Sequence, residues 1–221
     1  MTIQSRILFL FPSAVMLLAS MSFLWICQSP SFYSITALLF TLYGFPLLIH
    51  KIHNYFYPLE EGISYLKGKQ YSPWWGSHQI QSIYISFTIL ESVLRLIPGA
   101  FSLWLRLWGA KVGKNVYWTP KLEIADRSLI EIGDNVVFGQ SCAVISHAIK
   151  PKKQDLMLYV KKIKIGNNVF IGAGSYITPG VIVKDETFIS AQSSLYPNKI
   201  ISPSLSNNLS NNKNQLTQHQ N

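Results

Sequence analysis

Residues 163–183 read IKIGNNVFIGAGSYITPGVIV, and a β-branched residue recurs in this stretch at every sixth position. These positions are Ile165, Ile171, Ile177 and Val183. A six-residue period is typical of a parallel β-helix, in which short strands are joined by tight turns and each repeat stacks on the next. β-Branched residues suit the inward positions of such strands. This stretch therefore predicts a β-helix.

The same period extends in both directions along the chain. The other leading residues are Val112, Trp118, Ile124 and Ile130, then Ile132, Phe138 and Val144 after a two-residue slip, and finally Ile189 and Leu195. A β-sandwich would instead show period-two alternation and turn signals about every 8–12 residues. We therefore assign residues 111–200 to a β-helix domain and residues 201–221, rich in Asn, Gln and Ser, to a disordered polar tail.

The N-terminal part is apolar, with no charged residue between Arg6 and Lys51. Ile7–Cys27 and Phe32–Ile49 are each about long enough to cross a bilayer as a helix. A cleaved signal peptide fits poorly because a second apolar span follows at once, and a buried helical pair in a soluble core is the other alternative. We assign residues 1–50 to a membrane hairpin, and the positive-inside rule places both of its ends in the cytoplasm. This predicts an inner (cytoplasmic) membrane protein whose downstream domain lies on the cytoplasmic side.

Residues 51–110 are expected to form an amphipathic connector. Trp74 and Trp75 suit either the lipid headgroup level or a small core. Helical spacing predicts one helix over Ile80–Ile97, with Glu91 and Arg95 four residues apart. A short second helix over residues 101–108 has the composition of an interfacial helix. A third full span is disfavoured because its charged residues would be costly in lipid.

Composition excludes several classes of protein. Charged residues make up 13% of the 221 residues, and the net charge is +9, which argues against an ordinary soluble domain. Cys27 and Cys142 lie far apart, so they exclude a disulfide scaffold and a CxxC zinc site. No motif indicates nucleic-acid binding.

Three segments carry a family resemblance: IEIGDNVVFG (130–139), SHAI (146–149) and residues 163–183. They resemble the hexapeptide-repeat acyltransferases, in particular the maltose and galactoside O-acetyltransferases and the colanic-acid acetyltransferases. The resemblance implies a mainly β fold with a left-handed parallel β-helix. It also implies a homotrimer with active sites between neighbouring subunits, and acetyl-CoA or another acyl-CoA as co-substrate.

His147 is the one histidine within the repeat region. Acyl transfer to a hydroxyl needs a base, and a neutral imidazole suits that role near neutral pH. The resemblance places the family's catalytic histidine at His147. It places the oxyanion donor near Thr119, where the family has Asn, and it matches Asp126 to a family Asp.

The resemblance also implies a CoA groove along the last coils. The matching residues are Phe170, Ala173, Gly174, Ala191 and Tyr196. Phe170 replaces the family's Trp, and Ser190 and Gln192 replace glycines. The insertion 150–164 is expected to be an exposed loop, in which Lys161 and Lys162 are candidate ligands for CoA phosphates or an anionic acceptor.

These observations predict a membrane-anchored, acyl-CoA-dependent O-acyltransferase that acts on a sugar or lipid-linked sugar hydroxyl, with membrane lipid as a further partner. The alternative is a non-catalytic trimeric scaffold of a membrane assembly. Zinc chemistry of the carbonic-anhydrase type would need three histidines, and the repeat region holds one, so no metal is expected.

Overall fold

The structure is a computed structural model that describes residues 2–67, 70–153 and 155–203. It divides into two compact units. The helical unit comprises the described residues of Met1–Glu60, Ser64–Phe87 and Lys150–Met157. The β-helix unit comprises those of Glu61–Ile63, Thr88–Ile149 and Leu158–Asn221. The predicted disordered tail falls outside the described residues from residue 204 onward. The expectation of a mainly β fold overstates the strand content, because 42% of the described residues are helical.

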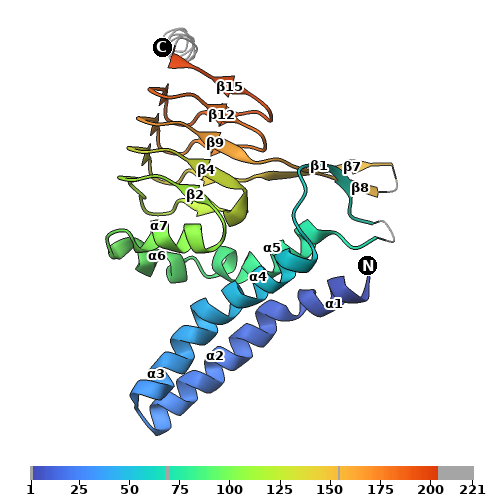
Figure 1. Cartoon of the computed structure of the whole chain (residues 1–221), viewed down its shortest axis with the longest axis vertical. Coiled ribbons are helices and arrows are strands. Elements are labelled where there is room, and N and C mark those ends of the chain that lie inside the picture. The colour runs from blue at the N-terminus through green and yellow to red at the C-terminus, as the bar shows by residue number, and fades with distance from the viewer. Residues whose placement is uncertain (1, 68–69, 154, 204–221) are drawn as a thin grey trace, which may run out of the picture. The chain divides into compact units, whose positions relative to one another are not determined.

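The helical unit contains both predicted apolar helices, each built from shorter pieces. The pieces are α1 (Ile3–Phe9), α2 (Phe11–Gln28), α3 (Phe32–Leu39), a π-helical turn (Phe40–Gly44), α4 (Phe45–Phe56) and α5 (Pro73–Ser86). Pro12 and Pro46 stand in the first turns of α2 and α4, where a missing N–H removes no bond within the new helix. Ser31 and Ser34 form a capping box that starts α3. α2 and α3 pack side by side (Figure 1).

Two helical stretches, Ile3–Gln28 and Phe32–Phe56, are long and apolar enough to cross a membrane. That statement rests on their length and composition alone. Only 17% of the most apolar window of each stretch is buried inside the protein.

The helix expected over Ile80–Ile97 is wrong as a single element. α5 ends at Ser86, and α6 (Ile89–Leu96) begins after Phe87 leaves the helical conformation. Gly99 then adopts a left-handed φ of 78°, which glycine reaches without a steric penalty. This turn leads into α7 (Ala100–Leu107), which agrees with the second short helix expected from the sequence.

The β-helix unit confirms the six-residue repeat. Its short parallel strands stack coil upon coil (Figure 1). They are β2 (Lys111–Val112), β3 (Glu123–Ile124), β4 (Ile130–Ile132), β5 (Val137–Phe138), β6 (Ala143–Val144), β9 (Ile163–Ile165), β10 (Phe170–Ile171), β11 (Tyr176–Ile177), β12 (Ile182–Val183), β13 (Phe188–Ile189), β14 (Ser194–Leu195) and β15 (Ile200–Ile201).

The registers of these strands bring the leading residues into three inward columns. One column is Val112, Ile132, Ile165, Val183 and Ile201, the second is Phe138, Ile171 and Ile189, and the third is Ile124, Val144, Ile177 and Leu195. All of these side chains are buried. Each full coil therefore uses three six-residue repeats, and its core is continuous along the axis.

Two interruptions of the period have defined structures. The two-residue slip is absorbed by a 3₁₀ turn at Arg127–Leu129. The insertion expected as an exposed loop instead contains β7 (His147–Lys152) and β8 (Asp155–Val160), which join β1 (Gly62–Tyr65) in a sheet of order β1-β8-β7. That expectation was wrong because DLMLYV (155–160) alternates in a way that suits a strand.

Glycine is required where successive coils meet at one corner. A Cβ atom on Gly139 would lie 2.3 Å from the backbone nitrogen of Ala173, and one on Gly172 would lie 2.3 Å from that of Ala191. Ser190 follows in the same corner, since its carbonyl carbon would lie 2.6 Å from a Cβ atom on Gly172.

Replacement of Gly172 by Ala should force the corner at Ala191 to move. Overpacking of this kind costs about 1–3 kcal/mol, so we expect Gly172→Ala to lower the midpoint of urea unfolding. The exposed neighbour Ala173, changed to Ser, serves as the matched control and should leave the midpoint unchanged. Equal midpoints for both variants would contradict the close approach of the coils.

One outward face of the β-helix carries a charge cluster around Glu131. The Glu131 carboxylate lies 3.1 Å from both Lys111 Nζ and Lys162 Nζ, and 3.8 Å from Lys164 Nζ. Burial raises the pKa of Glu131, but the hydrogen bonds and charges of Lys162 and Lys111 outweigh it. The pKa of Glu131 therefore lies below its ordinary value.

A lowered pKa makes the contribution of Glu131 to folding depend on pH. The stabilisation is present above the ordinary pKa of 4.5 and is lost as pH falls through the lower, folded-state value. We expect Glu131→Gln to reduce the unfolding free energy by about 1 kcal/mol at pH 7. The gap from the wild type should close as unfolding is measured at progressively lower pH below 4.5. A gap that does not change with pH would argue against this charge cluster.

Candidate active site

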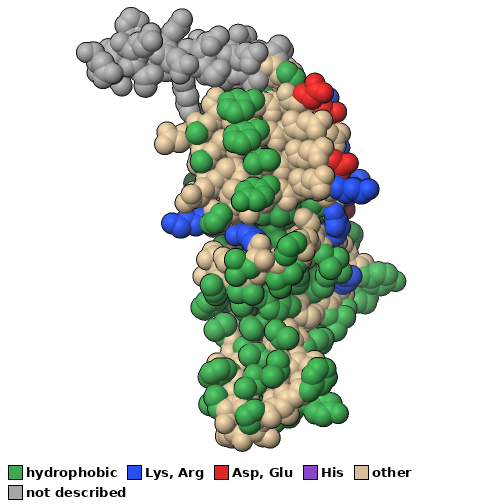
Figure 2. Space-filling view, turned by 90° about the vertical axis from the view of Figure 1, so that its left-hand side faces the viewer, with side chains coloured by type: hydrophobic (Ala, Val, Ile, Leu, Met, Phe, Trp, Pro, Cys, Tyr) green, Lys and Arg blue, Asp and Glu red, His purple; other side chains and the backbone are tan. Residues whose placement is uncertain are grey.

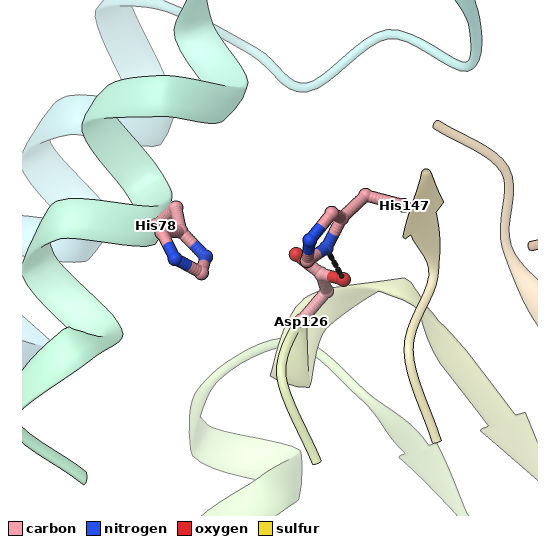
Figure 3. A group of neighbouring side chains, drawn as sticks. All are labelled: His78, Asp126 and His147. Atoms are coloured by element: carbon pink, nitrogen blue, oxygen red, sulfur yellow. Dashed lines mark hydrogen bonds and ion pairs between the residues drawn. The ribbon is translucent and has the colours of Figure 1, made fainter. Parts of the chain in front are cut away.

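The structure brings two of the predicted residues, Asp126 and His147, into direct contact. His147 Nδ1 lies 2.7 Å from Asp126 Oδ2 (Figure 3). Asp126 is 2% exposed, and the His147 side chain is 16% exposed. The carboxylate is thus enclosed by protein, while part of the imidazole remains accessible.

The repeat register explains why these residues meet. Ile124 of β3 pairs with Val144 of β6, so the residues two positions further on, Asp126 and Ser146, also lie side by side. The Ser146 backbone N–H donates to Asp126 Oδ2 at 3.0 Å. The next residue, His147, then begins β7 as the chain leaves the coil.

Ser146 is a site residue that the sequence reasoning missed. It is fully buried, and its hydroxyl donates to the Leu129 carbonyl at 3.0 Å. Ser146 therefore holds both the Asp126 carboxylate and the end of the 3₁₀ turn. Its position directly before His147 and two residues after the leading Val144 was the available signal.

The hydrogen bond to Asp126 determines what the imidazole can do. The Asp126 carboxylate accepts a hydrogen bond from Nδ1–H, so the neutral ring carries its basic lone pair on Nε2. The same carboxylate stabilises the imidazolium that forms when Nε2 takes a proton. The pair therefore has the geometry of a general base with an orienting acid.

Thr119 is placed on the first coil, before β3. Its hydroxyl oxygen is buried and has no hydrogen-bond partner within the described part of the chain. The hydrogen bonds found among the described residues do not connect Thr119 to Asp126 or His147. The structure thus brings together two of the three predicted catalytic residues.

The predicted CoA residues all lie exposed on the last coils. They are Phe170, Ala173, Gly174, Ala191 and Tyr196. The ring of Phe170 stacks on that of Phe188, with centroids 5.3 Å apart and planes 10° from parallel. Phe188 was missed by the sequence reasoning, although it stands one full coil after Phe170.

The two predicted lysines already have partners within the protein. Lys161 Nζ donates to Asn198 Oδ1 at 2.9 Å. Lys162 Nζ donates to Glu131 Oε1 at 3.1 Å. Either amine would have to share or exchange these contacts to bind a phosphate.

The repeat region matches known proteins. Residues 162–196 match the family described as bacterial transferase hexapeptide (six repeats). Over 85 residues the chain is 35% identical to the galactoside O-acetyltransferase of Escherichia coli (strain K12), a match that covers 37% of this chain and 42% of that protein. Over 146 residues it is 28% identical to the delta-poly-L-ornithine synthetase of Acinetobacter baumannii (strain AB307-0294), which covers 64% of this chain and 10% of that protein.

Among solved structures, a hexapeptide-repeat containing acetyltransferase from Vibrio cholerae O1 biovar eltor, complexed with acetyl coenzyme A, aligns with a TM-score of 0.44. The identity is 17%, over 61% of this chain and 88% of that chain. The chain spans less than half the length of either curated relative. Its repeat region is similar to the hexapeptide-repeat transferases, and within that region to the galactoside O-acetyltransferases.

The contact between Asp126 and His147 should be visible without any substrate. In protein labelled with ¹⁵N-histidine, we expect one Nδ1–H signal shifted downfield by its bond to a carboxylate. Asp126→Asn keeps the shape but removes the charge, so this signal should move upfield or disappear. The exposed carboxylate of Glu123, changed to Gln, is the control. An unchanged spectrum for Asp126→Asn would show that the pair does not form.

Proposed function

We propose that the chain is an O-acetyltransferase that uses acetyl-CoA and is attached to a membrane. The observation that carries this proposal is the hydrogen-bonded pair of buried Asp126 and part-exposed His147. Asp126 stands directly before the 3₁₀ turn and His147 stands where the chain leaves the coil. The sequence of this β-helix is similar to galactoside O-acetyltransferases.

His147 acts as the general base in the proposed reaction. Nε2 takes the proton of the acceptor hydroxyl while the hydroxyl oxygen bonds to the thioester carbonyl carbon. The tetrahedral intermediate then breaks its carbon–sulfur bond. The CoA sulfur leaves with the proton that the imidazolium returns, so the products are an acetyl ester and free CoA. Asp126 keeps Nδ1 protonated throughout.

Thr119 is the proposed donor to the oxyanion of that intermediate. Its hydroxyl is buried and unpartnered among the described residues, and such a group gains a hydrogen bond when a negative oxygen forms beside it. The family's amide at this place is a stronger donor, so Thr119 is expected to contribute less than His147.

Acetyl-CoA is proposed to lie along the exposed residues of the last coils. Small side chains at Ala173 and Ala191 let a pantetheine chain approach the backbone, and the stacked rings of Phe170 and Phe188 supply an apolar wall. Hydrophobic side chains form a column over successive coils (Figure 2). Tyr117, Val137, Phe170 and Phe188 belong to one outward row by their strand registers.

An exposed apolar row of this kind also supports the proposed homotrimer. A monomer rarely leaves a large contiguous apolar patch on its surface. Assembly through this face would cover the row and place the groove between neighbouring subunits.

The two apolar N-terminal helices support the proposed membrane attachment. Residues in the core of a soluble protein would be mostly buried, whereas only 17% of each window is buried here. The remaining apolar side chains suit contact with lipid. Arg6 and Lys51 flank the hairpin, so both ends are proposed to face the cytoplasm.

The helices α6 and α7 supply a second membrane contact in this proposal. α6 turns its charged residues inward and its apolar residues outward. Glu91 is 4% exposed, whereas Leu96 is 81% exposed. The other exposed apolar side chains of the two helices are Ile89, Val93, Leu103 and Leu107. A lipid interface covers such a face without a protein partner.

The acceptor is proposed to be a hydroxyl of a sugar or lipid-linked sugar. Membrane attachment would hold the enzyme close to an acceptor that is itself in the membrane. The similarity to proteins named galactoside O-acetyltransferases supports a sugar hydroxyl.

The test of catalysis uses isolated membranes that contain the full chain, supplied with labelled acetyl-CoA. Label should enter the lipid-extractable or polysaccharide fraction with the wild type, and His147→Ala should reduce the rate by about 10²- to 10⁴-fold. The fraction that gains label identifies the acceptor class. Equal label with both proteins would show that His147 is not the base, and label with neither protein would favour the scaffold.

The position of α6 is tested by a spin label on one introduced cysteine in lipid vesicles. The background is Cys27→Ser, which removes the exposed cysteine and keeps the buried Cys142. A label on Leu96→Cys should be accessible to oxygen and shielded from a water-soluble nickel complex. Lys184→Cys, on the exposed surface of the β-helix, is the control and should show the opposite order. A label at Leu96 that is open to nickel would place α6 in water.

A further inference from the structure

We infer that Glu91 and Arg127 are positioning residues for the catalytic pair, so that α6 determines where the Asp126 carboxylate stands. The inference rests on the proposed function, because it assigns the pair a role in proton transfer. Its geometric part, the dependence of the pair on α6, stands on the contacts described below.

Arg127 follows Asp126 directly and begins the 3₁₀ turn. Its side chain is 1% exposed, and its Nε donates to Glu91 Oε1 at 2.6 Å. The guanidinium carbon also lies 5.9 Å from the centre of the Trp108 ring. A buried guanidinium held this closely fixes the backbone of its own residue and of the residue before it.

Glu91 is in turn held from two further directions. Trp104 Nε1 of α7 donates to Glu91 Oε1 at 3.1 Å. Arg95 lies 3.7 Å from Glu91 Oε2. Glu91 is therefore locked in one position by α6, α7 and the turn together, and all of these groups belong to the β-helix unit.

The segment that carries Asp126 is thereby fixed at three points. Upstream, the Arg95 guanidinium donates to the Leu122 carbonyl at 2.8 Å. At the turn, Glu91 holds Arg127. Downstream, the Ser146 hydroxyl holds the Leu129 carbonyl at 3.0 Å. The carboxylate between these points has little freedom to move away from His147.

The buried charges around Glu91 balance one another. Glu91 and Asp126 contribute two negative charges, and Arg95 and Arg127 contribute two positive charges. Burial disfavours the charged form of Arg95 and lowers its pKa, whereas the Glu91 carboxylate acts against this effect. Loss of the Glu91 charge would remove the carboxylate that holds the buried Arg127 guanidinium and so loosen the turn that follows Asp126.

The test compares Glu91→Gln with a matched control in the full chain. Gln keeps the size of Glu91 but removes its charge. The control is Arg106→Gln, because Arg106 also ties a helix to the first coil, through bonds of 2.9 and 2.8 Å to the Val112 and Gly113 carbonyls. Both variants lose a helix-to-coil contact, but only Glu91→Gln loses one next to Asp126.

The expected result has two parts. Glu91→Gln should lower kcat by up to about 100-fold with little change in KM for acetyl-CoA, and it should shift or broaden the downfield His147 Nδ1–H signal. Arg106→Gln should leave both unchanged, even if its Tm falls. A double variant, Glu91→Gln with Arg127→Met, removes both charges of the pair and should recover part of the Nδ1–H signal.

The inference is overturned if Glu91→Gln leaves the His147 signal and kcat as in the wild type, or if Arg106→Gln changes them equally. That outcome is distinct from failure of the proposed function. If the wild type transfers no acetyl group, the function fails, whereas the nuclear magnetic resonance readout still decides whether Glu91 positions the pair.

Discussion

Every coil of the β-helix must bring the chain back into register with the neighbouring coil. The backbone N–H and C=O groups of each two- or three-residue strand bond to the coils on either side, so a coil out of register would leave buried polar groups unpaired. This constraint determines the inward columns of Val, Ile, Leu and Phe residues. It also determines the glycines at Gly139 and Gly172, where the next coil passes too close for a Cβ atom.

The candidate active site lies where this register is interrupted. Asp126 stands at the start of the 3₁₀ turn that absorbs two extra residues, and His147 stands where the chain leaves the coil. The pairing of Ile124 with Val144 brings the turn at Asp126 close to the point where the chain leaves the coil at His147. A regular coil provides a rigid support, and the deviations provide side chains that do not have to fill the core. The network of Glu91, Arg95 and Arg127 then stabilises the turn that a perfect repeat would not contain.

The β-helix could be predicted from the sequence because every sixth residue is apolar, and these residues form the buried columns of the coils. His147 could be predicted as a site residue for a different reason. It is the one histidine of the repeat region, and its position resembles that of the family's catalytic base. The sequence did not predict that α6 buries its charged residues and exposes its apolar ones. The spacing of Glu91 and Arg95 indicates a pair on one helix face, but it cannot show that this face turns inward toward Arg127. The strands β7 and β8 were missed because the lysines of the insertion suggested a solvated loop, and the break at Phe87 because the apolar spacing continues across it.

The most direct measurement is a structure of the full chain with acetyl-CoA bound, determined in a lipid environment. The proposed acetyl transfer requires the thioester to lie beside His147, with room for a hydroxyl oxygen about 3 Å from both Nε2 and the carbonyl carbon. It also requires the pantetheine chain to run along Ala173 and Ala191. A CoA molecule bound with its thioester remote from every copy of His147 in the assembly would contradict the assignment of this pair as the catalytic base.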